Sequence, residues 1–406
     1  MCMNTIRKGV WGVGYALAAT LATMDRPASA EVTFEWVTVG NPGNAADPLN
    51  SAAIPGIGSV ASVYRIAKFE VTNAQYAEFL NAVAATDPNG LYKPNMGSES
   101  RGGITQSGSP GSFTYAVRAN MGNKPVNFVS FFDAMRFVNW LHNGQPMGGQ
   151  DASTTEEGVY TISDGISETR AMDAQFFIPT QNEWYKAAYH QPSSASGDND
   201  DYWLYPTASN SVPTIATANA TGDVSNPGTN VVNYSNGAVW NGAPGNVTSA
   251  GSAGPLSDSF YGAADLAGNV FEWNEFVAGT QRSLRGGSWA SVEGNLQSVN
   301  QNFSAPSLWG ASQGFRVASP GPPEPVGTCC ISNGSCDAEG NCQESITQAG
   351  CKSLGGRFFG PNLSCAEVCA NGACIPTVST WGIVALLLLI VTAGTIVLVR
   401  RRIPVR

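Results

Sequence analysis

The sequence predicts an exported α+β protein with little regular secondary structure, a small disulfide-rich module and a C-terminal transmembrane helix. Three observations support this prediction: helix start signals among short apolar runs, cysteines crowded into one segment, and an uncharged apolar stretch near the end. Gly, Asn and Ser are abundant, whereas charged residues make up only 13% of the 406 residues. This composition is typical of a loop-rich fold.

Residues 1–30 have the pattern of a secretory signal peptide. Arg7 and Lys8 precede an apolar stretch over residues 10–24, and Ala28-Ser29-Ala30 supplies a small-residue cleavage site. We expect cleavage after Ala30. A first transmembrane helix is the alternative, although the apolar stretch is short and contains glycines.

One large domain is expected over residues 31–319, with three helices inside it. Thr72, Ser130 and Thr180 are each followed three residues later by Gln, Asp or Glu, which is the spacing of a capping box or close to it. Asn143-Gly144 is the expected end of the second helix. Elsewhere Gly, Pro, Asn and Ser interrupt short apolar runs, a pattern that predicts short strands between long loops. Apolar residues recur at helical spacing behind the three start signals and should pack in the core: Tyr76, Phe79, Leu80, Val83, Ala134, Phe137, Val138, Leu141, Trp184, Ala187 and Ala188.

A Pro-rich linker over residues 320–326 separates this domain from a cysteine-rich module over residues 327–374. Eight of the nine cysteines lie in the module, and Cys2 lies in the leader. An even number in so short a segment is typical of a disulfide framework in an oxidising compartment, with up to four bridges and an open pairing. The eight are Cys329, Cys330, Cys336, Cys342, Cys351, Cys365, Cys369 and Cys374.

The C-terminal segment, residues 375–406, predicts a membrane anchor. Residues 381–399 carry no charge and are just long enough to cross a bilayer core of about 30 Å. Arg400, Arg401 and Arg402 follow, so the tail should stay in the cytoplasm. Ile375-Pro376-Thr377 with Trp381-Gly382 resembles bacterial C-terminal sorting signals, which implies processing by a membrane peptidase. A plain anchor is the alternative.

The net charge argues against nucleic acid as a partner. The chain carries a formal charge of −9 and has a pI near 4.8. A protein that binds a phosphate backbone needs a basic face, and this composition does not provide one.

Six sequence blocks in the large domain occur in the order found in one enzyme family. Each block is weak evidence alone, but six in order at plausible spacing are specific. From about residue 32 to 317 the chain resembles the formylglycine-generating-enzyme (sulfatase-modifying-factor) family, whose fold is related to C-type lectins. The blocks are KFEVTN (68–73), PVNFVS (125–130), IPT to EW (178–184), DLAGNVFEW (265–273), RGGSW (285–289) and GFR (314–316).

The resemblance implies a copper-dependent oxidase that converts a substrate cysteine to formylglycine through two active-site cysteines. The matching positions here are about Leu296 and Gln301, and no cysteine occurs from residue 31 to 328. Thiolates supply the affinity of a Cu(I) site, so we expect no copper, no formylglycine generation and no catalytic residue at these positions. The His-ligated iron of the sulfoxide-synthase branch needs a histidine cluster. This chain has only His142 and His190, which we expect to be structural or solvated.

The resemblance also implies a structural calcium held by Asp265, Gly268, Val270 and Glu272. Two carboxylates and two backbone carbonyls would form the hard oxygen shell that Ca²⁺ prefers. The alternative is a turn in which Asp265 and Glu272 accept hydrogen bonds from backbone amides. A second family site, at Asn233 and the Tyr234 carbonyl, is not expected because its acidic ligand is replaced near Ser249.

Residues 290–313 are rich in Asn, Gln and Ser, and they include the aromatic residues Phe303 and Trp309. In lectin-like relatives the same region displays a ligand-binding surface, and aromatic side chains beside small polar ones suit adaptable recognition. A polar loop that satisfies its own backbone is the alternative. The ligand-binding candidates are Trp289, Phe303, Trp309 and Arg316.

These features together predict a cell-envelope protein that is membrane-anchored or released after C-terminal processing. The expected role is non-catalytic binding of a glycan or peptide, or a structural role. One alternative is an oxidoreductase of the same family with different active-site chemistry. Another is an inert component of a surface layer.

Overall fold

The computed structural model describes residues 31–50, 53–322, 327–331, 342–346, 351, 354, 356–358 and 364–365. The predicted signal peptide, the 381–399 helix and the sorting signal lie outside these residues. Within the described ranges, no helix is long and apolar enough to cross a membrane.

Among the residues that the structure describes, helices are few and short, as expected from a loop-rich composition. The three longest, α1 (Asn73–Val83), α3 (Phe131–His142) and α4 (Gln181–Tyr189), lie where the sequence placed them. The remaining helical segments are α2 (Asn95–Ser98) and the 3-10 turns η1 (Ser193–Ala195), η2 (Pro255–Ser257) and η3 (Glu293–Leu296).

Strands of two to eight residues form several small sheets. β1, β2 and β11 make an antiparallel sheet in the order β1-β2-β11, which joins the two ends of the large domain. A second sheet has the order β10-β7-β8-β9, with β10 parallel to β7 and the other pairs antiparallel. The strands of the large domain are β1 (Trp36–Val39), β2 (Tyr64–Ala67), β3 (Ile104–Ser107), β4 (Thr114–Val117), β5 (Thr214–Ile215), β6 (Val231–Val232), β7 (Phe271–Ala278), β8 (Gln281–Arg285), β9 (Asn302–Ser304), β10 (Gln313–Gly314) and β11 (Ala318–Pro320).

Each long helix begins with the predicted capping box. The hydroxyl groups of Thr72, Ser130 and Thr180 accept hydrogen bonds from the backbone N–H three residues later, and the side chain at that position bonds back to the cap. This reciprocal pair satisfies two amides that a helix start otherwise leaves free. Helix α3 ends at His142 with Asn143 as its C-cap, and Gly144 follows with a φ of +84°, a conformation that glycine adopts without strain.

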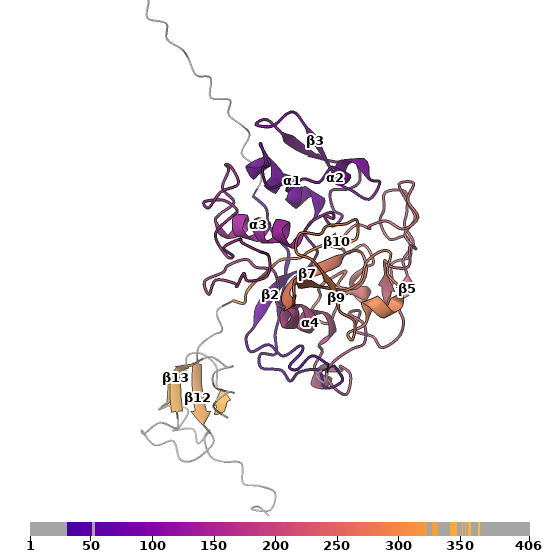
Figure 1. The fold of residues 1–406 in the computed structure, drawn as a ribbon. Coiled ribbons are helices and arrows are strands. Elements are labelled where there is room, and N and C mark those ends of the chain that lie inside the picture. Colours follow the sequence, from indigo (N-terminus) through magenta and orange to yellow (C-terminus); the bar gives the residue numbers. More distant parts are fainter. Residues whose placement is uncertain are drawn as a thin grey trace, which may run out of the picture.

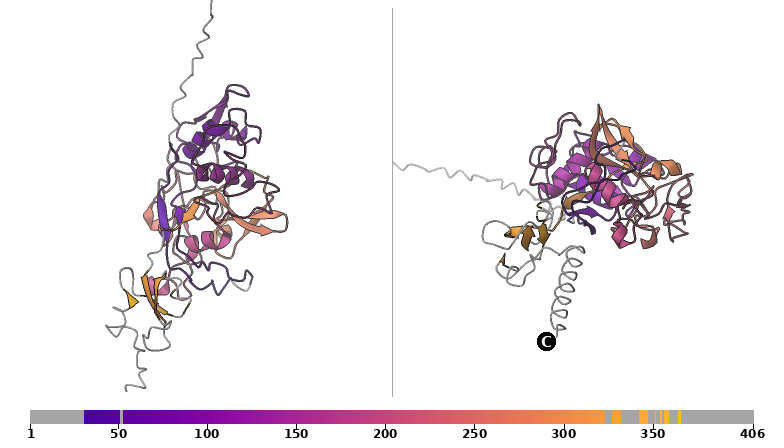
Figure 2. Two further views of the ribbon diagram at one scale, coloured as in Figure 1. Left: turned by 90° about the vertical axis from the view of Figure 1, so that its left-hand side faces the viewer. Right: turned by 90° about the horizontal axis from the view of Figure 1, so that it is seen from below.

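The core lies between α1, α3 and the sheets. Phe79 and Phe137 meet edge to face at 5.3 Å between ring centroids, and Trp140 packs beside both rings. Figures 1 and 2 show α1 and α3 toward one end of the large domain and α4 toward the other, with β7 between them. Helix α4 contacts β7 directly, which brings its first turn close to the four-stranded sheet.

Pro320, the first residue of the predicted linker, is part of strand β11. Pro320 pairs with Tyr64 as the last residue of β11. β11 is an edge strand, and a proline without an N–H is tolerated at such an edge.

The cysteine-rich module forms a small antiparallel sheet in the order β13-β12-β14, from β12 (Gly327–Ile331), β13 (Cys342–Ile346) and β14 (Gly356–Phe358). Two disulfides are present in the described part, Cys329–Cys351 and Cys342–Cys365. The prediction of a disulfide framework is therefore confirmed for four cysteines. The pairing of the other four lies outside the described residues.

Candidate functional site

Leu296 and Gln301, the two positions that match the family's copper-binding cysteines, differ from each other in their surroundings. Leu296 is fully buried in an apolar cluster that includes Tyr205 and Val232. The Gln301 amide nitrogen donates to the Gln181 side-chain oxygen and, at 3.1 Å, to the Ser283 hydroxyl group. An aliphatic group and an engaged amide offer no thiolate for Cu(I). Within the described residues, no three His, Cys, Asp or Glu side chains are grouped so as to share a metal ion.

A cavity of about 320 Å³ opens beside this amide network, at the first turn of α4. Gln181 belongs to both the network and the cavity wall, so the cavity adjoins the position of a family cysteine. The wall combines neutral polar groups, an aromatic ring and one carboxylate. Its lining residues are Ile54, Pro55, Thr180, Gln181, Asn182, Glu275 and Phe276.

Glu275, the one carboxylate among the described residues of this wall, is held by two other side chains. Arg170 donates to both of its oxygens, at 2.9 and 3.0 Å, and the Tyr160 hydroxyl group donates at 2.5 Å. Burial raises the pKa of Glu275, and the Arg170 charge acts in the opposite direction. Arg170 also forms a two-point ion pair with Glu183. The wall is therefore preorganised around a fixed ion-pair network.

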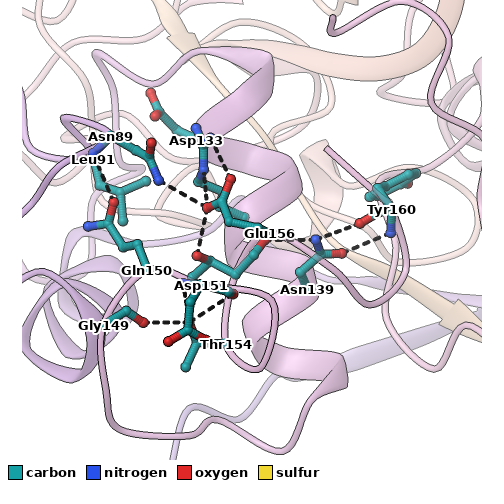
Figure 3. Close-up of polar contacts among 12 residues, drawn as sticks. Asn89, Leu91, Asp133, Asn139, Gly149, Gln150, Asp151, Thr154, Glu156 and Tyr160 are labelled. Carbon is teal, nitrogen blue, oxygen red and sulfur yellow. Dashed lines mark hydrogen bonds and ion pairs between the residues drawn. The ribbon is translucent and has the colours of Figure 1, made fainter. Parts of the chain in front are cut away.

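Asn139, on helix α3, holds the following loop and its Tyr160 in place (Figure 3). The Asn139 amide nitrogen donates to the carbonyl oxygens of Thr155 and Tyr160, both at 2.8 Å, and its oxygen accepts from the Tyr160 N–H at 2.9 Å. Glu156 accepts from the Asn89 amide nitrogen at 3.0 Å in the same loop. Asn139 on α3 is thus linked to the cavity wall by two steps. It bonds to the backbone of Tyr160, and the Tyr160 hydroxyl group bonds to Glu275 on the wall.

Of the four predicted ligand contacts, Phe303 lies near the cavity. Its ring is 38% exposed and lies 6.4 Å from that of Phe276, which lines the cavity and is equally exposed. Trp309 is also 38% exposed and packs against Phe128. Trp289 is mostly buried, with Arg101 stacked 4.1 Å from its ring centroid.

The expectation that Arg316 contacts a ligand is wrong. The side chain has no exposed surface, and its guanidinium group donates to both oxygens of Glu272, at 2.6 and 2.7 Å. It also donates to three backbone carbonyls, those of Ala67, Lys68 and Ala264. Arg316 is a structural cation at the centre of the domain.

The residues predicted to hold calcium are only partly free to do so. Glu272 accepts three hydrogen bonds, two from Arg316 and one from the Trp184 indole nitrogen at 2.7 Å. These occupy three of the roughly four lone-pair directions of a carboxylate. Asp265 accepts from the Gly251 N–H at 2.6 Å, as the alternative turn arrangement requires. Calcium at the four-residue set stays a prediction, and Glu272 fits it poorly.

A lysine ammonium group lies beside Ser249, where the second family calcium site would need an acidic ligand. Lys124 donates to the Ser249 hydroxyl group at 3.1 Å and to the carbonyl oxygens of Asn120 and Thr221. Burial lowers the pKa of Lys124 to about 8, with Asp223 opposing the shift. A cation at this position repels a second one.

The two histidines have separate surroundings. His190 is buried, with its ring nitrogens 2.7 Å from the Tyr261 hydroxyl group and 3.3 Å from the Asn41 amide nitrogen. His142 accepts from the Gln175 N–H at 3.2 Å. Both contact sets suit structural side chains.

Comparison with known proteins supports the family indicated by the sequence blocks. The family model described as the sulfatase-modifying factor enzyme 1-like domain matches residues 39–320. Hercynine oxygenase from Mycolicibacterium smegmatis is 24% identical over 285 residues, a match that covers 63% of this chain and 52% of the oxygenase. The chain thus spans about half the length of that relative.

Solved structures that match this chain share little sequence with it. Treponema denticola variable protein 1 is 18% identical with a TM-score of 0.40, over 72% of this chain and 97% of its own. CarF is 20% identical with a TM-score of 0.42, over 71% of this chain and 99% of its own. The family model covers more than half of the chain. Residues 39–320 therefore make this protein a member of the sulfatase-modifying factor enzyme 1-like family.

Proposed function

We propose that this protein is an exported, non-catalytic binding protein of the cell envelope, whose ligand occupies the cavity at the start of α4. The observation that carries the proposal is the link between Gln301 and the cavity wall through Gln181. The cavity adjoins Gln301, one of the two positions that the family resemblance assigns to active-site cysteines, and neither Leu296 nor Gln301 has a thiol. The predicted signal peptide and anchor support the location, with the membrane and a sorting peptidase as further partners.

The wall chemistry favours a ligand rich in neutral hydrogen-bonding groups, such as a glycan or a peptide segment. Thr180, Gln181 and Asn182 offer hydroxyl and amide groups, and Phe276 offers an apolar face. A few polar groups in an apolar frame are typical of small-ligand sites. Arg170 partly neutralises the negative charge of Glu275, so a strong charge on the ligand is not required.

Binding to glycan and peptide arrays tests this proposal. Phe276→Ser should weaken binding of any array ligand by about tenfold or more, because it removes a ring from the cavity wall. Phe260→Ser is the matched control, since Phe260 is 40% exposed but does not line the cavity. Equal loss in both variants, or no ligand on either array, would count against the cavity as a binding site.

An oxidoreductase with different chemistry is the alternative, and the similarity to an oxygenase favours testing it. With copper, oxygen and a cysteine-containing sulfatase peptide, the protein should form no aldehyde above a heat-inactivated control. The physical reason is that Leu296 and Gln301 cannot bind Cu(I) as thiolates do. Mass spectrometry of the peptide gives the answer, and measurable aldehyde would restore the enzymatic interpretation.

A further inference from the structure

The first turn of α4 has free hydrogen-bond donors beside the cavity. Thr180 caps the helix by accepting from the Glu183 N–H, but the backbone N–H groups of Gln181 and Asn182 have no partner among the residues that the structure describes. The start of a helix leaves such amides available to a cap, to water or to a ligand. Gln181 and Asn182 both line the cavity, so their amides are donors of its wall.

The Gln181 side chain independently indicates a ligand at this place. It is only 5% exposed, and its oxygen accepts from Gln301. Its amide nitrogen has no partner within the described ranges, although Gln181 lines the cavity. A buried donor is rarely left without a partner, because its lost hydration is then not replaced. The Asn182 amide nitrogen is a further such donor, since Asn182 uses its oxygen to accept from the Gly58 N–H at 3.1 Å.

The same wall offers one carboxylate oxygen as an acceptor. Glu275 Oε1 accepts from Arg170 Nε and from the Tyr160 hydroxyl group, whereas Oε2 accepts only from Arg170 Nη2 within the part of the chain described. A carboxylate oxygen can accept two hydrogen bonds, so Oε2 has room for one from a ligand. Arg170 pairs with two carboxylates, those of Glu183 and Glu275, which leaves one net negative charge when both are ionised. That charge disfavours a carboxylate on the ligand.

Apolar side chains complete the wall and limit the size of the ligand. Ile54, Pro55 and the half-exposed ring of Phe276 lie beside the polar groups, and the Phe303 ring is 6.4 Å from that of Phe276. The cavity volume of about 320 Å³ is at the small end of the roughly 300–1,000 Å³ found for ligand pockets. The site therefore suits one small ring with a short substituent.

We propose that the cavity binds the acetamido group of an N-acetylated amino sugar, an inference that rests on the proposed function. The acetamido carbonyl accepts from the donors of Gln181 and Asn182, its N–H donates to Glu275 Oε2, and its methyl group packs against Phe276. A free ammonium group offers donors alone and would leave the α4 donors unmatched. A peptide has one N–H for each carbonyl, whereas ring and hydroxyl oxygens of a sugar supply the further acceptors that this donor-rich wall requires.

Calorimetry of the purified full chain with defined probes tests this assignment. The N-acetylglucosamine tetramer should bind at least about tenfold more tightly than the glucosamine tetramer or the glucose tetramer, because it alone has both the carbonyl acceptor and the amide donor. N-acetyl-dialanine methylamide has the same amide chemistry on a peptide, and it should also bind at least about tenfold more weakly.

A single exchange in α4 tests the role of its donors. Asn182→Asp removes one donor and keeps the oxygen that accepts from Gly58. It should weaken binding of the N-acetylglucosamine tetramer by about tenfold, since the acetamido carbonyl then faces a carboxylate. Asn236→Asp is the matched control, because Asn236 is exposed and does not line the cavity, and it should bind like the wild type.

Saturation-transfer NMR of the wild type gives a measurement that needs no variant. Irradiation of the aromatic protons should transfer most strongly to the acetyl methyl protons, because the methyl group lies against Phe276. Stronger transfer to the sugar ring protons would overturn the assignment, as would equal weakening in Asn182→Asp and Asn236→Asp.

Two results separate this inference from the proposed function. Tighter binding of the glucose tetramer or of the peptide, with loss in Phe276→Ser, would overturn the acetamido assignment and support the cavity as a binding site. Absence of binding by all four probes would also overturn the assignment. The proposed function fails only if the arrays, too, give no ligand that depends on Phe276.

Discussion

Replacing Arg316 with methionine should destabilise the large domain by about 3–5 kcal/mol. Arg316 makes five hydrogen bonds from a fully buried guanidinium group, two of them to Glu272. Without it, Glu272 becomes a buried charge with only the Trp184 indole as partner. Breaking a buried ion pair from one side typically costs about 3–5 kcal/mol. Urea denaturation monitored by tryptophan fluorescence measures the loss.

Two further variants show whether the cause is the unpaired charge. The double variant Glu272→Leu/Arg316→Met should recover part of the stability, because no charge is then left without a partner. Arg65→Met is the matched control, since Arg65 is only partly buried and bonds to Ser319 and Pro320. If Arg65→Met loses as much stability as Arg316→Met, the loss in Arg316→Met cannot be assigned to its ion pair with Glu272.

The helices were predictable because their signals are local. A capping box needs only two residues three positions apart, and the contacts at Thr72, Ser130 and Thr180 are made within one turn. The apolar stripes behind them follow the helical period and are buried as expected. Such patterns do not depend on the rest of the chain.

The cavity was not predictable, because its wall is assembled from three distant segments. Ile54 and Pro55, the start of α4, and Glu275 with Phe276 meet only in the folded domain. The sequence of each segment alone predicts only an ordinary loop, helix start or strand. Phe303 is a candidate from the sequence because its segment is rich in small polar residues. Its position near Phe276 depends on the pairing of β9 with β8.

The sequence does not show that the charged side chains of Arg316 and Glu272 are buried at the centre of the domain. Arg316 follows Gly314-Phe315 in a block that gives no sign of whether the side chain points inward, and the structure buries it completely. Pairing of Glu272 with Arg316 joins residues 44 positions apart, which no local pattern encodes.

Lowering the pH from about 6.5 to 4 should destabilise the large domain through His190. Burial, and then the charge of Lys186, lower the pKa of His190 to about 4, while Asp201 acts in the opposite direction. The unfolded chain, with an ordinary histidine pKa near 6.5, binds a proton in this range that the folded domain does not. The contribution of His190 to stability therefore rises with pH between 4 and 6.5.

His190→Gln should remove this part of the pH dependence, which amounts to about 3 kcal/mol between the two ends of the range. The structural reason is that Asn41 directs an amide N–H at one ring nitrogen, so a second proton there has no acceptor. Urea denaturation of wild type and variant from pH 4 to 7 gives the difference curve. His142→Gln is the control, since His142 accepts a single backbone hydrogen bond near the surface. A flat difference curve for His190→Gln would show that His190 binds its proton over the same pH range in the folded and the unfolded chain.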